Sequence, residues 1–85
     1  MKTFSYVIKD EVGIHARPAG LLVKEAKGFK SNIKLRVDGK SVEATKLMAI
    51  MSLGIKKGQT VEIEIDGEDE ENAYEDMKAF FEKNL

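Results

Sequence analysis

The clearest strand signal in the chain is TVEIEID at residues 60–66. Its apolar residues Val61, Ile63 and Ile65 alternate with a threonine and two glutamates. This period of two indicates a strand with one buried and one solvated face. The stretch ends at Asp66-Gly67, a turn signal. The sequence therefore predicts a sheet that packs on one side and meets water on the other.

Two neighbouring stretches extend this sheet. Residues 32–44 read NIKLRVDGKSVEA, an alternating run followed by Asp38-Gly39 and a short return strand at 40–44. Asp-Gly between alternating runs is a strong signal for a tight hairpin turn. At the start of the chain, residues 3–8 alternate in the same way. We expect four strands in all.

Apolar residues recur at helical spacing in three other segments. Helices are predicted at residues 16–27, 47–53 and 70–83, and the last has its acidic residues early and its lysines late, which suits the helix dipole. We expect the side chains of Thr45 and Asp69 to cap the second and third of these helices.

The resulting element order, β-α-β-β-α-β-α, predicts an α+β fold. Eighty-five residues form one small domain with a single core, so we assign residues 1–85 to one domain. Each strand needs cover on only one side, which favours an antiparallel sheet with helices packed on one face.

Composition narrows the function classes. The net charge of −1 argues against a general nucleic-acid binder, which needs a basic surface. The absence of cysteine and the single histidine exclude thiolate and His-rich metal sites, so we expect no metal and no cofactor, although carboxylates alone could hold a hard cation. No stretch approaches the roughly 20 apolar residues that cross a bilayer, and no signal peptide is seen. A cytoplasmic protein without membrane insertion is expected.

The residues that carry chemistry are GIHARP at 13–18, at the junction of a loop and the first helix. His15 falls at or next to the N-cap, and Arg17 falls in the first turn with Ala16 and Pro18. The free N–H groups of a first helical turn hold anions, and an arginine can fork onto phosphate oxygens. The same positive field disfavours imidazolium, which leaves a neutral ring nitrogen as a nucleophile. Local chemistry leaves a second interpretation open, in which His15 only caps the helix or faces solvent.

The same residues resemble a known family. GIHARPA at 13–19, GKSV at 39–42 and LMAIMSLG at 47–54 are similar to segments of HPr, the histidine phosphocarrier of the bacterial sugar phosphotransferase system. The resemblance covers nearly the whole chain in order. It implies an open-faced β-sandwich, a four-stranded antiparallel sheet with three helices on one face. It also implies that His15 takes phosphate on Nδ1 from phospho-enzyme I and passes it to IIA domains of sugar permeases, with Arg17 orienting the phosphate. Such a protein is a carrier and not an independent catalyst.

Transfer between proteins requires a docking face around His15. Exposed apolar residues on the first two helices, some of them methionines, suit recognition of several partners, and lysines would surround them. The expected docking residues are Gly20, Leu21, Lys24, Lys27, Lys46, Leu47, Met48 and Met51. Burial of the methionines is the alternative, and for Met51 the two interpretations are equally supported.

One position departs from the family pattern. Many Gram-positive relatives have a regulatory serine directly before the Leu47-Met48 pair, and Lys46 stands there in this chain. A lysine has no hydroxyl to phosphorylate, which puts regulation by a kinase at this position in doubt. We expect Lys46 to favour an acidic partner surface instead.

Three functions compete. The first is the sugar-system carrier, expected as a monomer. The second is a regulatory docking module of the same fold, which has no need of His15 or Arg17. The third is a nitrogen-type phosphorelay carrier with the same chemistry and different partners. The sugars and permeases that are served lie outside what this sequence encodes.

Overall fold

The computed structural model describes residues 1–85 and contains every element that the sequence predicts. No predicted end differs from the observed one by more than one residue. In chain order the elements are β1 (Lys2–Val7), α1 (Ala16–Ala26), β2 (Asn32–Val37), β3 (Lys40–Glu43), α2 (Leu47–Ser52), β4 (Thr60–Asp66) and α3 (Glu70–Asn84).

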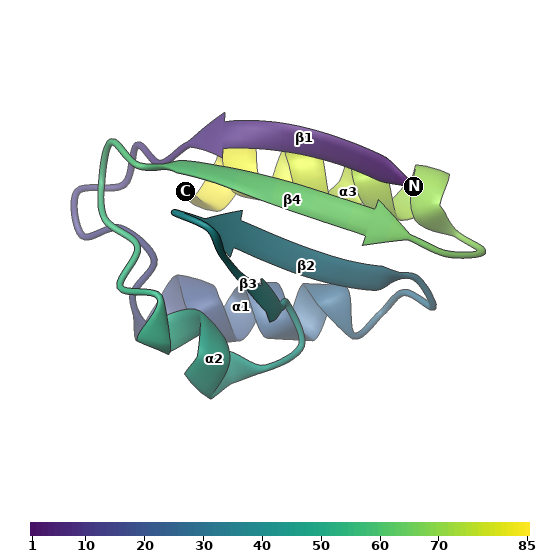
Figure 1. The fold of residues 1–85 in the computed structure, drawn as a ribbon, viewed down its shortest axis with the longest axis horizontal. Helices are drawn as coiled ribbons and strands as arrows, with labels where there is room; N and C mark the ends of the chain where they lie inside the picture. Colours follow the sequence, from purple (N-terminus) through teal and green to yellow (C-terminus); the bar gives the residue numbers. More distant parts are fainter.

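The four strands form one antiparallel sheet in the order β1-β4-β2-β3. The three helices cover one face of this sheet, with α3 behind β1 and β4 and α1 packed beside α3, toward the β2 side of the sheet (Figure 1). α2 packs against α1 and β3. The predicted open-faced β-sandwich is therefore confirmed.

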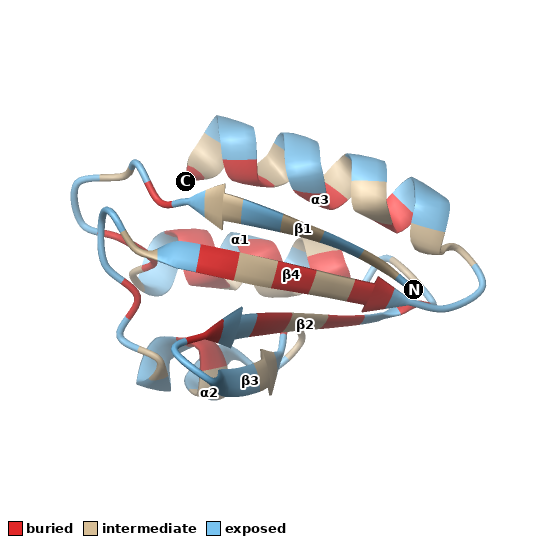
Figure 2. Cartoon of the chain, turned by 45° about the horizontal axis from the view of Figure 1, so that its top comes forward, coloured by how far each residue is buried: buried red, intermediate tan, exposed pale blue.

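The core lies between the sheet and the helices. Val61, Ile63 and Ile65 of the central strand β4 are fully buried, whereas the residues between them are only partly covered (Figure 2). From the helix side, Leu22 and Phe81 are fully buried against them. The alternation in the sequence thus sets which face of the sheet packs.

The hairpin turn follows from its two residues. Asp38 and Gly39 have φ angles of 51° and 80°. A tight turn with both central residues in the left-handed region matches the twist of the flanking strands, and Asp-Gly tolerates it. β2 and β3 therefore pair in register, with Val37 opposite Lys40.

The uncovered face of the sheet is polar. Arg36 of β2 lies 3.7 Å from the carboxylates of both Glu62 and Glu64 on the neighbouring β4. Side chains of opposite charge pair across neighbouring strands, which balances their charges. This face of the sheet is therefore solvated rather than packed against another layer.

Both predicted helix caps are wrong. Lys46, not Thr45, is the N-cap residue of α2, and its side chain makes no capping bond. Asp69 is the N-cap residue of α3, but its carboxylate accepts hydrogen bonds from the N–H groups of Lys30 and Ser31, each at 2.8 Å, and from the Ser31 hydroxyl. Asp69 therefore joins the start of α3 to the loop between α1 and β2, a tertiary contact that outcompetes the local cap.

This contact predicts an acid-sensitive stability. The hydrogen bonds from Ser31 and Lys30 hold the pKa of Asp69 below its usual range. A carboxylate whose pKa is lower in the folded chain stabilises the fold above its unfolded pKa, and the gain disappears as the pH falls through the folded value. We expect Asp69→Asn to lower the midpoint of thermal unfolding at pH 7 and to show a smaller further loss than the parent chain below pH ~4.

The control for this prediction is Asp66→Asn, which removes the same charge from an exposed carboxylate near the same end of the sheet. Circular dichroism across a pH series provides the measurement. Equal midpoints for the Asp69 variant and the parent chain at pH 7 would contradict the role of this contact.

Candidate functional site

His15 occupies the N-cap position of α1, as predicted. Its backbone is extended, with φ −97° and ψ −174°, and its side chain makes no capping hydrogen bond. The side chain is 40% exposed. The ring therefore points toward solvent rather than back onto the helix or into the core.

Backbone hydrogen bonds fix the loop that presents this ring. The Ile14 N–H donates to the Ile55 carbonyl oxygen at 3.1 Å, and the Gly58 N–H donates to the Ile8 carbonyl oxygen at 2.8 Å. Ile14 and Ile55 are both buried. The loop before α1 is thus held against the loop before β4, and His15 projects from a fixed backbone.

Gly13 makes this close approach possible, which predicts a large effect of substitution. Its φ angle is +77°, and a Cβ at this position would overlap the Ile55 carbonyl oxygen and lie 2.7 Å from the Lys56 Cα. We expect Gly13→Ala to lower the free energy of unfolding by about 3 kcal/mol, because backbone strain and a backbone clash add. Urea titration measures this loss.

Gly39→Ala is the matched control for Gly13→Ala. Gly39 has a similar φ of +80°, but a Cβ there has nothing within 4 Å. Its cost is then the left-handed conformation alone, about 1 kcal/mol. Equal losses in the two variants would show that the contact with Ile55 is unimportant.

The start of α1 has free hydrogen-bond donors. The N–H groups of Ala16 and Arg17 have no acceptor within the chain, because the first intrahelical bond runs from the Ala19 N–H to the His15 carbonyl oxygen. Pro18 has no N–H to donate, and it lines the same surface depression as His15. The Arg17 guanidinium is exposed and makes no ion pair. Two free N–H groups and one unpaired cation thus lie in the first turn of the helix that has His15 at its N-cap.

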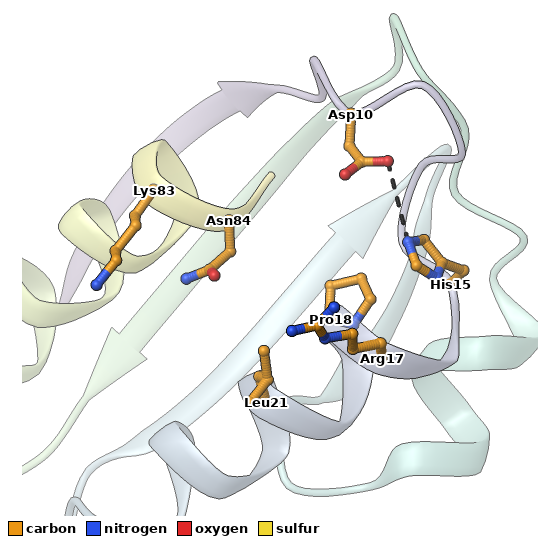
Figure 3. Close-up of a pocket in the computed structure, with 7 residues that line it drawn as sticks. All are labelled: Asp10, His15, Arg17, Pro18, Leu21, Lys83 and Asn84. Atoms are coloured by element: carbon orange, nitrogen blue, oxygen red, sulfur yellow. Dashed lines mark ion pairs between the residues drawn. The ribbon is translucent and has the colours of Figure 1, made fainter.

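His15, Arg17 and Pro18 border an open depression of about 240 Å³ (Figure 3). It is smaller than the clefts that usually enclose a drug-sized ligand, roughly 300–1,000 Å³, and suits a group the size of a phosphate. The lining residues are Asp10, His15, Arg17, Pro18, Leu21, Lys83 and Asn84.

Three of the lining residues were missed by the sequence analysis. Asp10 precedes the motif, and Lys83 and Asn84 come from the end of α3 (Figure 3). Only the packing of α3 beside α1 brings these last two residues to His15, so no local pattern could have indicated them. For Asp10 the only signal was its position in the loop before the motif.

The predicted docking residues lie on the surface of α1 and α2. Leu21 and Leu47 are 43% and 41% exposed, Met48 is 77% exposed and Met51 is 37% exposed. In contrast, Ile50 of α2 is buried in the core. Met51 is therefore not buried in the core, which rules out the alternative of burial.

The remaining predicted docking residues have open surroundings. Lys24, Lys27 and Lys46 are exposed, and a Cβ added at Gly20 would meet nothing within 4 Å. We call the set Leu21, Leu47, Met48 and Met51 the apolar patch. The three lysines lie on α1 or at the ends of α1 and α2, and the use of this surface in docking stays a prediction.

Neither a metal-binding cluster nor a membrane-spanning helix is present. No group of three or more histidine, aspartate or glutamate side chains is arranged to hold a metal ion. None of the helices combines the length and the apolar character needed to span a bilayer.

Comparison with known proteins identifies the family. The profile of the PTS-HPr family, described as PTS HPr component phosphorylation site, matches residues 2–83. The phosphocarrier protein HPr of Mycoplasma genitalium strain G37 is 50% identical over 86 aligned residues, covering 99% of this chain and 97% of that protein. The class is therefore that of small phosphocarriers, which carry a phosphoryl group and are not independent catalysts. The chain belongs to the HPr family of the phosphotransferase system.

Solved structures agree with this assignment. The crystal structure of HPr-C-His from Thermoanaerobacter tengcongensis superposes with a TM-score of 0.92 at 41% identity, covering 98% of this chain and 93% of that one. The Bacillus subtilis catabolite repression protein Crh gives a TM-score of 0.78 at 38% identity, covering 94% and 92% of the two chains. That Crh structure is described as a dimer with a swapped domain.

Proposed function

We propose that this chain carries a phosphoryl group on Nδ1 of His15, accepted from phospho-enzyme I and passed to IIA domains of sugar permeases. Residues 1–85 act as one unit in this proposal, in the cytoplasm and as a monomer. The single observation that carries it is the juxtaposition of an exposed imidazole with unsatisfied N–H groups and an unpaired guanidinium at the start of α1.

The proposed chemistry follows from these groups. The neutral ring attacks phosphorus through Nδ1, and the Ala16 and Arg17 N–H groups donate hydrogen bonds to the phosphoryl oxygens. The Arg17 guanidinium balances the negative charge on the transferring group. Because the site is open, the stabilisation is moderate and the carrier can release its phosphoryl group again.

The experiment combines the chain with phosphoenolpyruvate and a catalytic amount of enzyme I, followed by phosphorus NMR. We expect an acid-labile phosphoramidate that disappears when a IIA domain is added. A chain that stays unlabelled would contradict the proposal and favour a docking module. A chain that is labelled but does not discharge to sugar IIA domains would favour a nitrogen-type phosphorelay.

The proposed docking face predicts a specific loss of partner binding. We expect Met48→Glu to weaken binding of enzyme I at least about fivefold, because a charge would replace an apolar contact. Met48 is 77% exposed, so folding should be unaffected. Isothermal titration calorimetry measures the affinity.

Val7→Glu is the matched control for Met48→Glu. Val7 is also an exposed large apolar residue, at 49%, but it belongs to β1, the edge strand opposite β3, and not to α1 or α2. We expect its affinity for enzyme I to be that of the parent chain. Equal affinities for all three proteins would exclude Met48 from the docking face.

A further inference from the structure

Asp10 is a charged residue of the site that the proposed function does not use. Its Oδ1 lies 4.0 Å from Nε2 of His15, and the dashed line in Figure 3 joins these two atoms. The Asp10 side chain is 32% exposed. It therefore faces the ring nitrogen opposite to the one proposed to carry phosphate.

The backbone and side chain of Asp10 are both held in place. Its N–H donates to the Leu85 carbonyl oxygen at 2.9 Å, and its carbonyl oxygen accepts from the Gly13 N–H at 3.0 Å. Its Oδ1 accepts from the Val12 N–H at 2.9 Å. The carboxylate is thus positioned before any partner arrives.

The charges around His15 make this carboxylate unexpected. Arg17 and Lys83, the other charged groups of the depression, are both cations, and neither makes an ion pair. The next acidic residue in the chain, Glu11, pairs with Lys57 at 2.9 Å instead. A carboxylate repels an incoming phosphate, so its place in a cationic site calls for a compensating role.

We propose that Asp10 is a positioning residue for phosphoryl transfer: its carboxylate keeps the His15 proton on Nε2, so that the lone pair on Nδ1 is free to attack, and it stabilises the cationic ring that the attack produces. The proposal rests on the function proposed above. An aspartate beside a catalytic imidazole acts in the same two ways in hydrolases.

The changes in bonding and charge during the transfer explain why a fixed carboxylate helps. The Nδ1 lone pair forms the bond to phosphorus, and the bond from phosphorus to the donor breaks with its electron pair leaving on the donor atom. The ring keeps its Nε2 proton and gains a positive charge. When the phosphoryl group leaves for an acceptor, the pair of the N–P bond returns to Nδ1 and the ring is neutral again. The His15 proton stays on Nε2 in both directions, next to Asp10.

Asp10→Asn tests this role, because the amide oxygen can still accept from the Val12 N–H while the charge is removed. We expect phosphoryl transfer from enzyme I to slow about tenfold, since the lost interaction is partly exposed and screened by water. Nitrogen NMR of the labelled imidazole should also show the tautomer ratio shifting from Nε2–H toward Nδ1–H. Glu11→Gln is the control, because it removes the same charge from the next residue in the chain. The Glu11 carboxylate pairs with Lys57 and not with His15.

Both effects are required. A rate or a tautomer ratio that stays at the parent value in Asp10→Asn would overturn the proposal, as would an equal change in Glu11→Gln. The tautomer ratio is measured on the unphosphorylated chain. If the parent chain takes no phosphate, the proposed function fails while the effect of Asp10 on the ring is still measured.

Discussion

Replacement of His15 by alanine is expected to abolish phosphorylation by enzyme I completely. The chain has one histidine and no cysteine, so no other side chain offers a neutral ring nitrogen or a thiolate as the nucleophile. The variant should fold normally, because the His15 side chain is 40% exposed and makes no capping bond. Incorporation of labelled phosphate from phosphoenolpyruvate measures the loss.

The control for His15→Ala is a check that the variant still folds. The substitution keeps the backbone carbonyl of residue 15, to which the Ala19 N–H donates, so we expect α1 to begin at the same place. Unchanged circular dichroism together with absent labelling is the expected pair of results. Residual label at the parent level would mean that another side chain carries the phosphate.

Replacement of Arg17 by alanine is expected to slow phosphoryl transfer roughly a hundredfold. The guanidinium is unpaired in the free protein, so it can turn entirely to the transferring group without breaking an existing contact. Removal of one preorganised donor to a developing negative charge costs about 10²–10³ in rate. We expect a loss at the lower end of this range, because the cation of Lys83 still lines the site. Rapid-quench measurement of the transfer rate provides the test.

Two variants bracket the Arg17 prediction. Arg17→Lys keeps the charge but loses the planar fork, so its rate should fall between those of the parent chain and Arg17→Ala. Arg36→Ala removes the other arginine of the chain, which lies on the uncovered face of the sheet, and should leave the rate unchanged. Similar rates for Arg17→Ala and Arg36→Ala would contradict a direct role of the Arg17 guanidinium.

The fold was predictable because periodicity and turn chemistry agree along the chain. The alternation in β4 and the Asp38-Gly39 turn each specify which face of a strand is buried and where it reverses. The two capping predictions failed because they considered only the residues next to each helix start. Thr45 lies one residue before the N-cap of α2, and the Asp69 carboxylate is engaged outside α3. At Asp69, hydrogen bonds to a loop 38 and 39 residues away replace the local cap.

The site was predictable in part for a similar reason. His15 and Arg17 are neighbours in one motif, so their meeting follows from the start of a helix. Lys83 reaches the same depression only through the packing of α3 beside α1, and Asp10 faces the ring only because the loop before α1 folds back. Contacts that depend on tertiary packing leave no periodic signal in the sequence.

The most direct test of a phosphocarrier that uses Nδ1 is to locate the phosphoryl group on the ring. Nitrogen–phosphorus coupling in the phosphorylated, nitrogen-labelled protein identifies the bonded atom. Because Nε2 faces Asp10 at 4.0 Å, we predict coupling to Nδ1 of His15 alone. Coupling to Nε2, or phosphorus bonded to a residue other than His15, would contradict the account.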